Sequence, residues 1–258
     1  MVQAKKNLKR DNKAGVKPVP PDAVRVWRGF RLGTLPPADF LQALGTVFIP
    51  VTAQLQRLYG LTAYLPTVLP TSKADGVPDE IALVFYESQQ AYLDTSKIVT
   101  GRAYSALHKT VFAFPASQSG FPTLLGSTAA LDQPYHLFKG AVDWQAGFAQ
   151  VFVGARQASV PTPTFASQLQ RFFQQLQNHP PRGLDGAVFC ISSNWVVYWE
   201  HWESEAASLK GQISNLPKLA SRVLLQPYVA QPIETSLNTH YPGLSNVESK
   251  SFNILFPR

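Results

Sequence analysis

The chain has five histidines, the side chains best suited to proton transfer near neutral pH. None belongs to an H-x-x-x-H, H-E-x-x-H or Cys/His pattern, so the sequence predicts no metal site. His108 follows Tyr104 by one turn of an expected helix, where an imidazole that faces a sheet can act as a base. His201 follows a strand pattern beside Trp202 and can line the mouth of a pocket. For His108 the alternative is a surface or hydrogen-bonded core position, which is the commoner case. For His201 a solvent-exposed position at the start of a helix is an equally good explanation.

Aromatic residues near the ends of two expected strands suggest where a planar ligand binds. Tyr86 lies near the end of one strand and Trp199 near the end of another, and aromatic faces stack on flat molecules. For Trp199 and the aromatic residues around it, core packing is the stronger alternative. The sequence therefore offers His108, Tyr104 and His201 as catalytic candidates, and Tyr86 and Trp199 as ligand-binding candidates.

Most common catalytic motifs are missing from the sequence. It contains no P-loop, no G-x-G-x-x-G, no G-x-S-x-G and no clear pair of catalytic carboxylates. Cys190 is the single cysteine, which excludes an internal disulfide and a site with several thiolate ligands. Whether the protein is an enzyme is thus left open by its motifs.

The composition is that of a globular protein, with 45% hydrophobic and 15% charged residues in 258. No apolar stretch approaches the roughly 20 residues of a membrane-spanning helix, and no apolar segment follows the basic N-terminus as in a secretory signal. The expected location is cytoplasmic.

Most of the net charge of +7 lies in residues 1–22, since six basic residues and one acid precede Pro18. Such a flexible arm can bind an acidic partner, nucleic acid or anionic lipid. A solubilising tail without a partner is the alternative. The rest of the chain is close to neutral, which argues against RNA binding by the folded part.

An internal repeat is the most informative feature of the sequence. Residues 25–31 and 150–156 share one pattern, and the match continues without gaps at an offset of 125. The matched positions are Val26, Gly29, Arg31, Pro36, Phe40 and Leu44 against Val151, Gly154, Arg156, Pro161, Phe165 and Leu169. Each segment predicts a strand, a turn at the proline and then a helix with one apolar stripe. Pro50 should kink or break the first helix.

A second block predicts the later elements of each half. Val84 to Glu87 resembles Val197 to Glu200, with the offset shortened by twelve residues, and the loop 70–78 accounts for the extra chain. Helices are expected over 89–112 and 203–225. The last strand of the first half is expected near 135–141.

These patterns predict an α+β protein of two ferredoxin-like βαββαβ repeats. The expected domains are the arm 1–22, a first repeat 23–145 and a second repeat 146–258. Strand alternation separates Arg25, Trp27, Gly29 and Arg31 from Val26, Arg28 and Phe30. We expect the first set to face the opposing sheet and the second set to face the helices.

Two such halves resemble the dimeric α/β-barrel superfamily, in which antiparallel sheets pack face to face. That superfamily includes cofactor-free monooxygenases, muconolactone-isomerase-like proteins, EthD-like proteins and haem proteins of the chlorite-dismutase type. The resemblance implies an intrachain α/β barrel, a monomer or homodimer, and a ligand pocket between sheet and helices. It leaves two possibilities for the cofactor: either there is none, or the cofactor is haem, for which His108 is the candidate ligand.

The resulting hypothesis is a small-molecule pocket in one half only. It would bind a small hydrophobic ligand or haem and would oxidise or isomerise an aromatic or polyketide-like substrate. An enzyme of this kind would be monooxygenase-like or haem-dependent. The alternative is a non-enzymatic binding or assembly protein that uses the basic arm.

Overall fold

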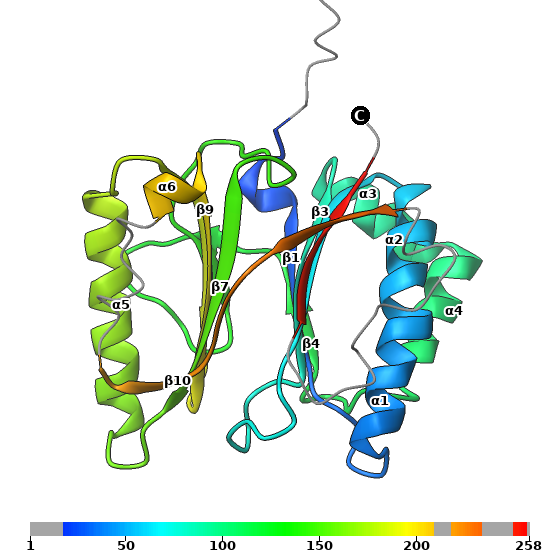
Figure 1. The fold of residues 1–258 in the computed structure, drawn as a ribbon, viewed down its shortest axis with the longest axis horizontal. Helices are drawn as coiled ribbons and strands as arrows, with labels where there is room; N and C mark the ends of the chain where they lie inside the picture. The colour runs from blue at the N-terminus through cyan, green and yellow to red at the C-terminus, as the bar shows by residue number, and fades with distance from the viewer. Residues whose placement is uncertain (1–17, 209–217, 234–249, 257–258) are drawn as a thin grey trace, which may run out of the picture.

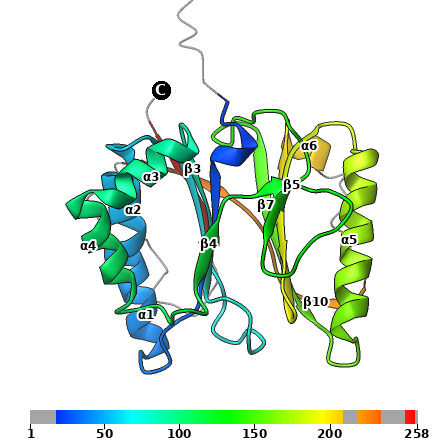
Figure 2. The ribbon, with the colours of Figure 1, turned by 180° about the vertical axis from the view of Figure 1, so that it is seen from behind.

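Two six-stranded sheets face each other, and helices cover their outer faces (Figures 1 and 2). This arrangement comes from a computed structural model that describes residues 18–208, 218–233 and 250–256. The expected α+β class is confirmed at this level. Most of the basic arm lies outside the described residues, and the predictions about its partners rest on that part of the chain. Within the described ranges, no helix is both long and apolar enough to span a membrane.

The first sheet has the strand order β11-β12-β2-β3-β1-β4. Its strands are β1 (Val24–Gly29), β2 (Leu61–Val68), β3 (Glu80–Tyr86), β4 (Gln118–Gly120), β11 (Val229–Pro232) and β12 (Lys250–Leu255). The helices on its outer face are α1 (Pro37–Ala43), the π-helical turn η2 (Leu44–Phe48), α2 (Ile49–Arg57), α3 (Gln89–Lys97) and α4 (Val99–His108). A short 3-10 turn, η1 (Pro21–Ala23), precedes β1.

The second sheet has the order β10-β7-β9-β8-β6-β5. Its strands are β5 (Thr123–Leu124), β6 (Pro134–His136), β7 (Phe148–Arg156), β8 (Leu184–Ile191), β9 (Trp195–Trp202) and β10 (Ala220–Pro227). Its outer face carries the long helix α5 (Thr162–Asn178) and the short α6 (Glu205–Ser208). The expected helix over 203–225 is wrong in its last part, because Ala220–Pro227 pairs with β7 as a strand.

Each sheet contains strands from both parts of the chain. The segment β4-β1-β3-β2 of the first sheet has the same order as β10-β7-β9-β8 of the second. At the outer edge of each segment the chain crosses over, so that β6 pairs with β8 and β12 pairs with β2, both antiparallel. The expected strand near 135–141 therefore joins the second sheet, and β4 takes its place in the first. The predicted division at residue 145 is crossed by strands in both directions.

Corresponding turns in the two parts make the same contacts. Gly60 and Gly183, which precede β2 and β8, both have φ +91° and accept hydrogen bonds from the backbone of Glu87 and Glu203, at 2.8 and 2.9 Å. The offset is 123 at these glycines and 116 at the glutamates. The predicted match of Val84 with Val197 is thus wrong by three residues, because 197 − 84 is 113.

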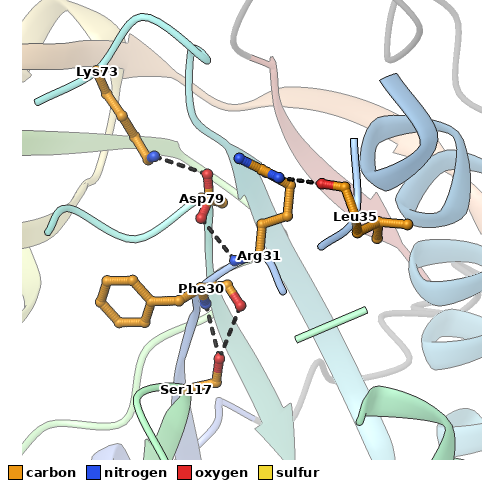
Figure 3. A network of polar contacts seen from close by, with 6 residues as sticks. All are labelled: Phe30, Arg31, Leu35, Lys73, Asp79 and Ser117. Carbon is orange, nitrogen blue, oxygen red and sulfur yellow. Dashed lines mark hydrogen bonds and ion pairs between the residues drawn. The ribbon is translucent and has the colours of Figure 1, made fainter. Parts of the chain in front are cut away.

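The extra chain lies in the loop between β2 and β3, as predicted, but it amounts to seven residues instead of twelve (123 − 116). This loop is anchored where β1 ends (Figure 3). Lys73 Nζ lies 2.8 Å from Asp79 Oδ1, and Asp79 Oδ2 accepts the backbone N–H of Arg31 at 2.7 Å.

The repeated arginines have matching structural roles. The Arg31 guanidinium donates to the carbonyl of Leu35 (Figure 3), and Arg156 donates to the carbonyl of Val160, four residues further on in each case. These bonds tie the end of β1 or β7 to the turn that leads into the next helix. They support the interpretation of both arginines as parts of the architecture.

The predicted sides of β1 are reversed. Val24 and Val26 belong to the core between the sheets, whereas Trp27 packs among the residues beneath the helices. Arg28 also points between the sheets, where it donates to Cys190 Sγ at 2.9 Å. Both faces of β1 are covered, so its alternation does not distinguish the sheet side from the helix side. As a consequence, Arg25 lies on the helix side.

Candidate functional site

A cavity of about 470 Å³ lies between the outer face of the first sheet and the helices α2, α3 and α4. That volume falls in the range of small-molecule sites. Its lining includes Arg25, Trp27, Phe48, Thr52, Gln56, Glu80, Ala82, Tyr86, Tyr92, Tyr104, His108 and Ser119. Three of the five predicted site residues, Tyr86, Tyr104 and His108, therefore share this cavity.

Glu80 provides a buried carboxyl group on the sheet side of the cavity. It begins β3, and its Oε2 accepts the indole N–H of Trp27 at 2.9 Å. Burial raises the pKa of Glu80 to about 8, although the bond from Trp27 acts in the opposite direction. Glu80 forms no salt bridge within the described part of the chain. The group is therefore mostly a neutral acid at pH 7 and can donate a hydrogen bond.

His108 lies on the helix side of the cavity, at the end of α4. Its Nδ1 lies 2.8 Å from the carbonyl oxygen of Tyr104, an arrangement that assigns the ring proton to Nδ1 and leaves Nε2 as an acceptor. Burial lowers the pKa of His108 to about 4, and the nearby charge of Arg25 contributes in the same direction. The imidazole is therefore neutral at physiological pH.

The two tyrosines are held by hydrogen bonds to α2 and the turn before it. The Tyr104 hydroxyl lies 2.5 Å from Thr52 Oγ1 and donates to the carbonyl of Phe48 at 3.0 Å. The Tyr86 hydroxyl donates to Gln56 Oε1 at 3.3 Å. Burial raises the pKa of both phenols, so both stay protonated. Their geometry suits shaping of the cavity more than proton transfer.

Arg25 brings a positive charge to the same cavity. Its guanidinium carbon lies 4.3 Å from the ring centre of Tyr92, and Nη2 donates to Ser119 Oγ at 2.5 Å. Arg25 lines the cavity together with Tyr86, Tyr104 and His108, and its positive charge lowers the pKa of all three groups. The predicted position of Arg25 between the sheets is therefore wrong.

Glu80 was also missed, although the sequence carries a signal for it. The acidic pair Asp79-Glu80 directly precedes the hydrophobic run 81–86, and an acid that enters such a buried strand is either paired or kept neutral by burial. Trp27 was missed because the side of β1 was misjudged.

His201 and Trp199 lie in the second sheet, away from this cavity. Both are buried on β9. His201 Nδ1 lies 2.6 Å from Asp185 Oδ1, and His201 Nε2 lies 2.6 Å from the carbonyl oxygen of Ala146. Both ring nitrogens therefore have hydrogen-bond partners. The indole of Trp199 donates to the hydroxyl of Tyr228 at 2.8 Å. These hydrogen bonds join β9 to Asp185 of β8, to the loop at Ala146 and to Tyr228 after β10, so both side chains have structural roles.

The corresponding position of the second sheet is filled by side chains. Strand pairing places Tyr198 where the first sheet has Ala82, an offset of 116. The Tyr198 ring is fully buried, 5.2 Å from that of Phe173, and Phe173 stacks on Phe189 at 3.8 Å. A small side chain in one sheet and a large one in the other thus distinguish the two helix-covered faces.

The residues of the cavity do not fit haem with His108 as its ligand. An iron-bound imidazole must present Nε2 to a flat slot as wide as the porphyrin. Here four aromatic rings surround the imidazole at centroid distances of 4.6 to 5.7 Å, those of Trp27, Phe48, Tyr104 and Phe112. No three metal-ligating side chains come together in the described ranges either.

Comparisons with known proteins give only distant structural likeness. No protein-family model matches the sequence, and no curated protein matches it. A "putative monooxygenase" from Fusobacterium nucleatum subsp. nucleatum has 11% identity and a TM-score of 0.36, over 82% of this chain and 95% of that chain. A second "putative monooxygenase", from Lactobacillus acidophilus, has 10% identity and a TM-score of 0.33, over 82% and 93%. An anthrone oxidase-like protein has 8% identity and a TM-score of 0.35, over 89% and 88%. Likeness at this level says nothing about chemistry.

Proposed function

We propose that the cavity beneath α2, α3 and α4 binds a small aromatic or polyketide-like molecule and enolises it by proton transfer, which leads either to isomerisation or to oxidation of the enolate by dioxygen. The observation that carries this proposal is the presence of Glu80 and His108 in one cavity of about 470 Å³. Trp27 connects the two groups, because its indole N–H binds Glu80 and its ring lies 5.5 Å from that of His108.

The two groups have complementary protonation states. A neutral carboxylic acid can donate a hydrogen bond to a substrate carbonyl and stabilise the oxyanion that forms there. The neutral imidazole of His108 can accept a proton through Nε2. Negative charge that develops on the substrate raises the pKa of His108 again, because an opposite charge favours the imidazolium. The first chemical step is then enolisation, which is common to isomerisation and to reaction of an enolate with oxygen.

We propose that the chain is a tandem pair of ferredoxin-like units that form an α/β barrel within one chain. The shared strand order and the matching contacts of Gly60 and Gly183 support this view. The cavity would then be the pocket that one unit keeps.

Enolisation can be measured directly as deuterium uptake by 2-tetralone, a bicyclic ketone, in D₂O. We expect the protein to accelerate uptake, and we expect Glu80→Gln and His108→Gln each to lower the rate about a hundredfold, as is typical for loss of a general acid or base. The rate should fall above about pH 8, where Glu80 ionises, and below about pH 4, where His108 is protonated.

Glu87→Gln and His179→Gln are matched controls, since both side chains are exposed to solvent. They should leave the rate unchanged. Exchange no faster than in buffer, or equal rates for all four variants and the native protein, would refute the proposed chemistry.

A further inference from the structure

We infer that the cavity recognises an aromatic carboxylic acid, whose carboxylate binds Arg25 and whose far end bears a carbonyl or hydroxyl group beside Glu80. This inference rests on the proposed function and names its ligand class. It would make Arg25 a specificity-determining residue of the site.

The charges of the cavity are unbalanced. Three cations line it, Arg25, Arg102 and Lys109, and the one acid in the lining is Glu80. Because burial raises the pKa of Glu80 to about 8, that acid supplies little negative charge at pH 7. An anionic ligand would compensate the excess positive charge.

Arg25 is the cation best placed to hold such an anion. It is half-buried and rests on the ring of Tyr92, whereas Arg102 and Lys109 are exposed. Among the described residues no carboxylate pairs with it, and its bonded neighbour is the neutral hydroxyl of Ser119. A guanidinium held flat by an aromatic ring and a hydroxyl is pre-organised for a two-point bond to a carboxylate.

The spacing of Arg25 and Glu80 sets the length of the ligand. Arg25 lies opposite Val84 in the β1–β3 ladder, and Glu80 lies four residues earlier on β3, on the same face. At roughly 3.3 Å per residue, the two backbone positions are about 13 Å apart. Between them lies Ala82, whose small side chain leaves room for a flat ring system. A molecule of two fused rings, polar at both ends, suits this spacing.

Two fluorescent probes test the inference, 6-hydroxy-2-naphthoate and its uncharged amide. We expect the native protein to bind the carboxylate at least tenfold more tightly at pH 7. In Arg25→Gln this preference should disappear while amide binding stays within twofold, and Arg25→Lys should keep part of it. The control Arg171→Gln removes an exposed arginine of α5 and should change nothing. Thermal unfolding of each variant checks its fold.

The possible outcomes separate the two proposals. Equal affinity of the native protein for both probes, or a preference that survives in Arg25→Gln, would overturn the inference but leave a cavity that binds planar molecules. If neither probe binds, a cavity for flat bicyclic molecules is itself refuted, and the proposed function falls together with the inference.

Discussion

Glu80 shows at the scale of one residue how a buried acid lowers stability. Burial raises the pKa of its carboxyl to about 8 in the folded protein, whereas the unfolded chain loses the proton near the ordinary pKa of 4.5. Between these values the unfolded state holds fewer protons, so stability falls as the pH rises. Below pH 4.5 both states are protonated and the penalty vanishes.

Glu80→Gln should remove this penalty, because the amide oxygen can still accept the Trp27 indole. We expect the variant to gain stability over the native protein as the pH rises from 5 to 8, by at most about 1.4 kcal/mol per pH unit. Urea unfolding at pH 5 and pH 8 measures the difference. Glu87→Gln, at the exposed residue that directly follows the same strand, should show no such trend. A constant difference between Glu80→Gln and the native protein at both pH values would contradict a buried neutral acid.

At the scale of elements, the cavity depends on the break between α3 and α4. The chain is extended at Ile98 (ψ 161°), and α4 then turns back so closely that a Cβ on Gly101 would lie 2.0 Å from the carbonyl oxygen of Thr95. Both helices contribute lining residues. The wall above the sheet is therefore set by a contact that only glycine permits.

Gly101→Ala should push α3 and α4 apart. We expect a loss of about 1 to 3 kcal/mol in the free energy of unfolding, the usual range for forced overpacking, together with weaker binding of 6-hydroxy-2-naphthoate. Gly33→Ala is the matched control, because nothing lies within 4 Å of its Cβ position. Equal stability of the two variants in urea unfolding would show that the junction is not tight.

The sequence predicted those elements whose patterns are local. The strand and helix after Arg25 and after Gln150 lie where the pattern placed them, and so does the loop 70–78. The strand β10 was missed because pairing with β7 overrides the weak preference of its residues. The prediction of which side of β1 faces the helices is wrong because both sides are buried. For this reason the sequence did not indicate that Arg25 lines the cavity. The crossing strands β6 and β12 are short and gain their place only through partners distant in the sequence.

At the scale of the whole molecule, two similar sheets carry different helix-side interiors. The reciprocal pairing of β6 with β8 and of β12 with β2 ties each sheet to chain from the other part, so the sheets are expected to unfold together. The cavity lies under the face with Ala82, and Tyr198 takes the corresponding place in the other sheet. One substitution can therefore make the first face resemble the second.

Calorimetric titration of 6-hydroxy-2-naphthoate into Ala82→Tyr is the most direct test of the cavity as a ligand site. The tyrosine ring should occupy the ligand's space, so we predict at least a tenfold loss of affinity, which corresponds to about 1.4 kcal/mol. The control Ala103→Tyr adds the same bulk on the exposed side of α4 and should bind like the native protein. Native affinity in a folded Ala82→Tyr variant would place the ligand elsewhere and contradict the account.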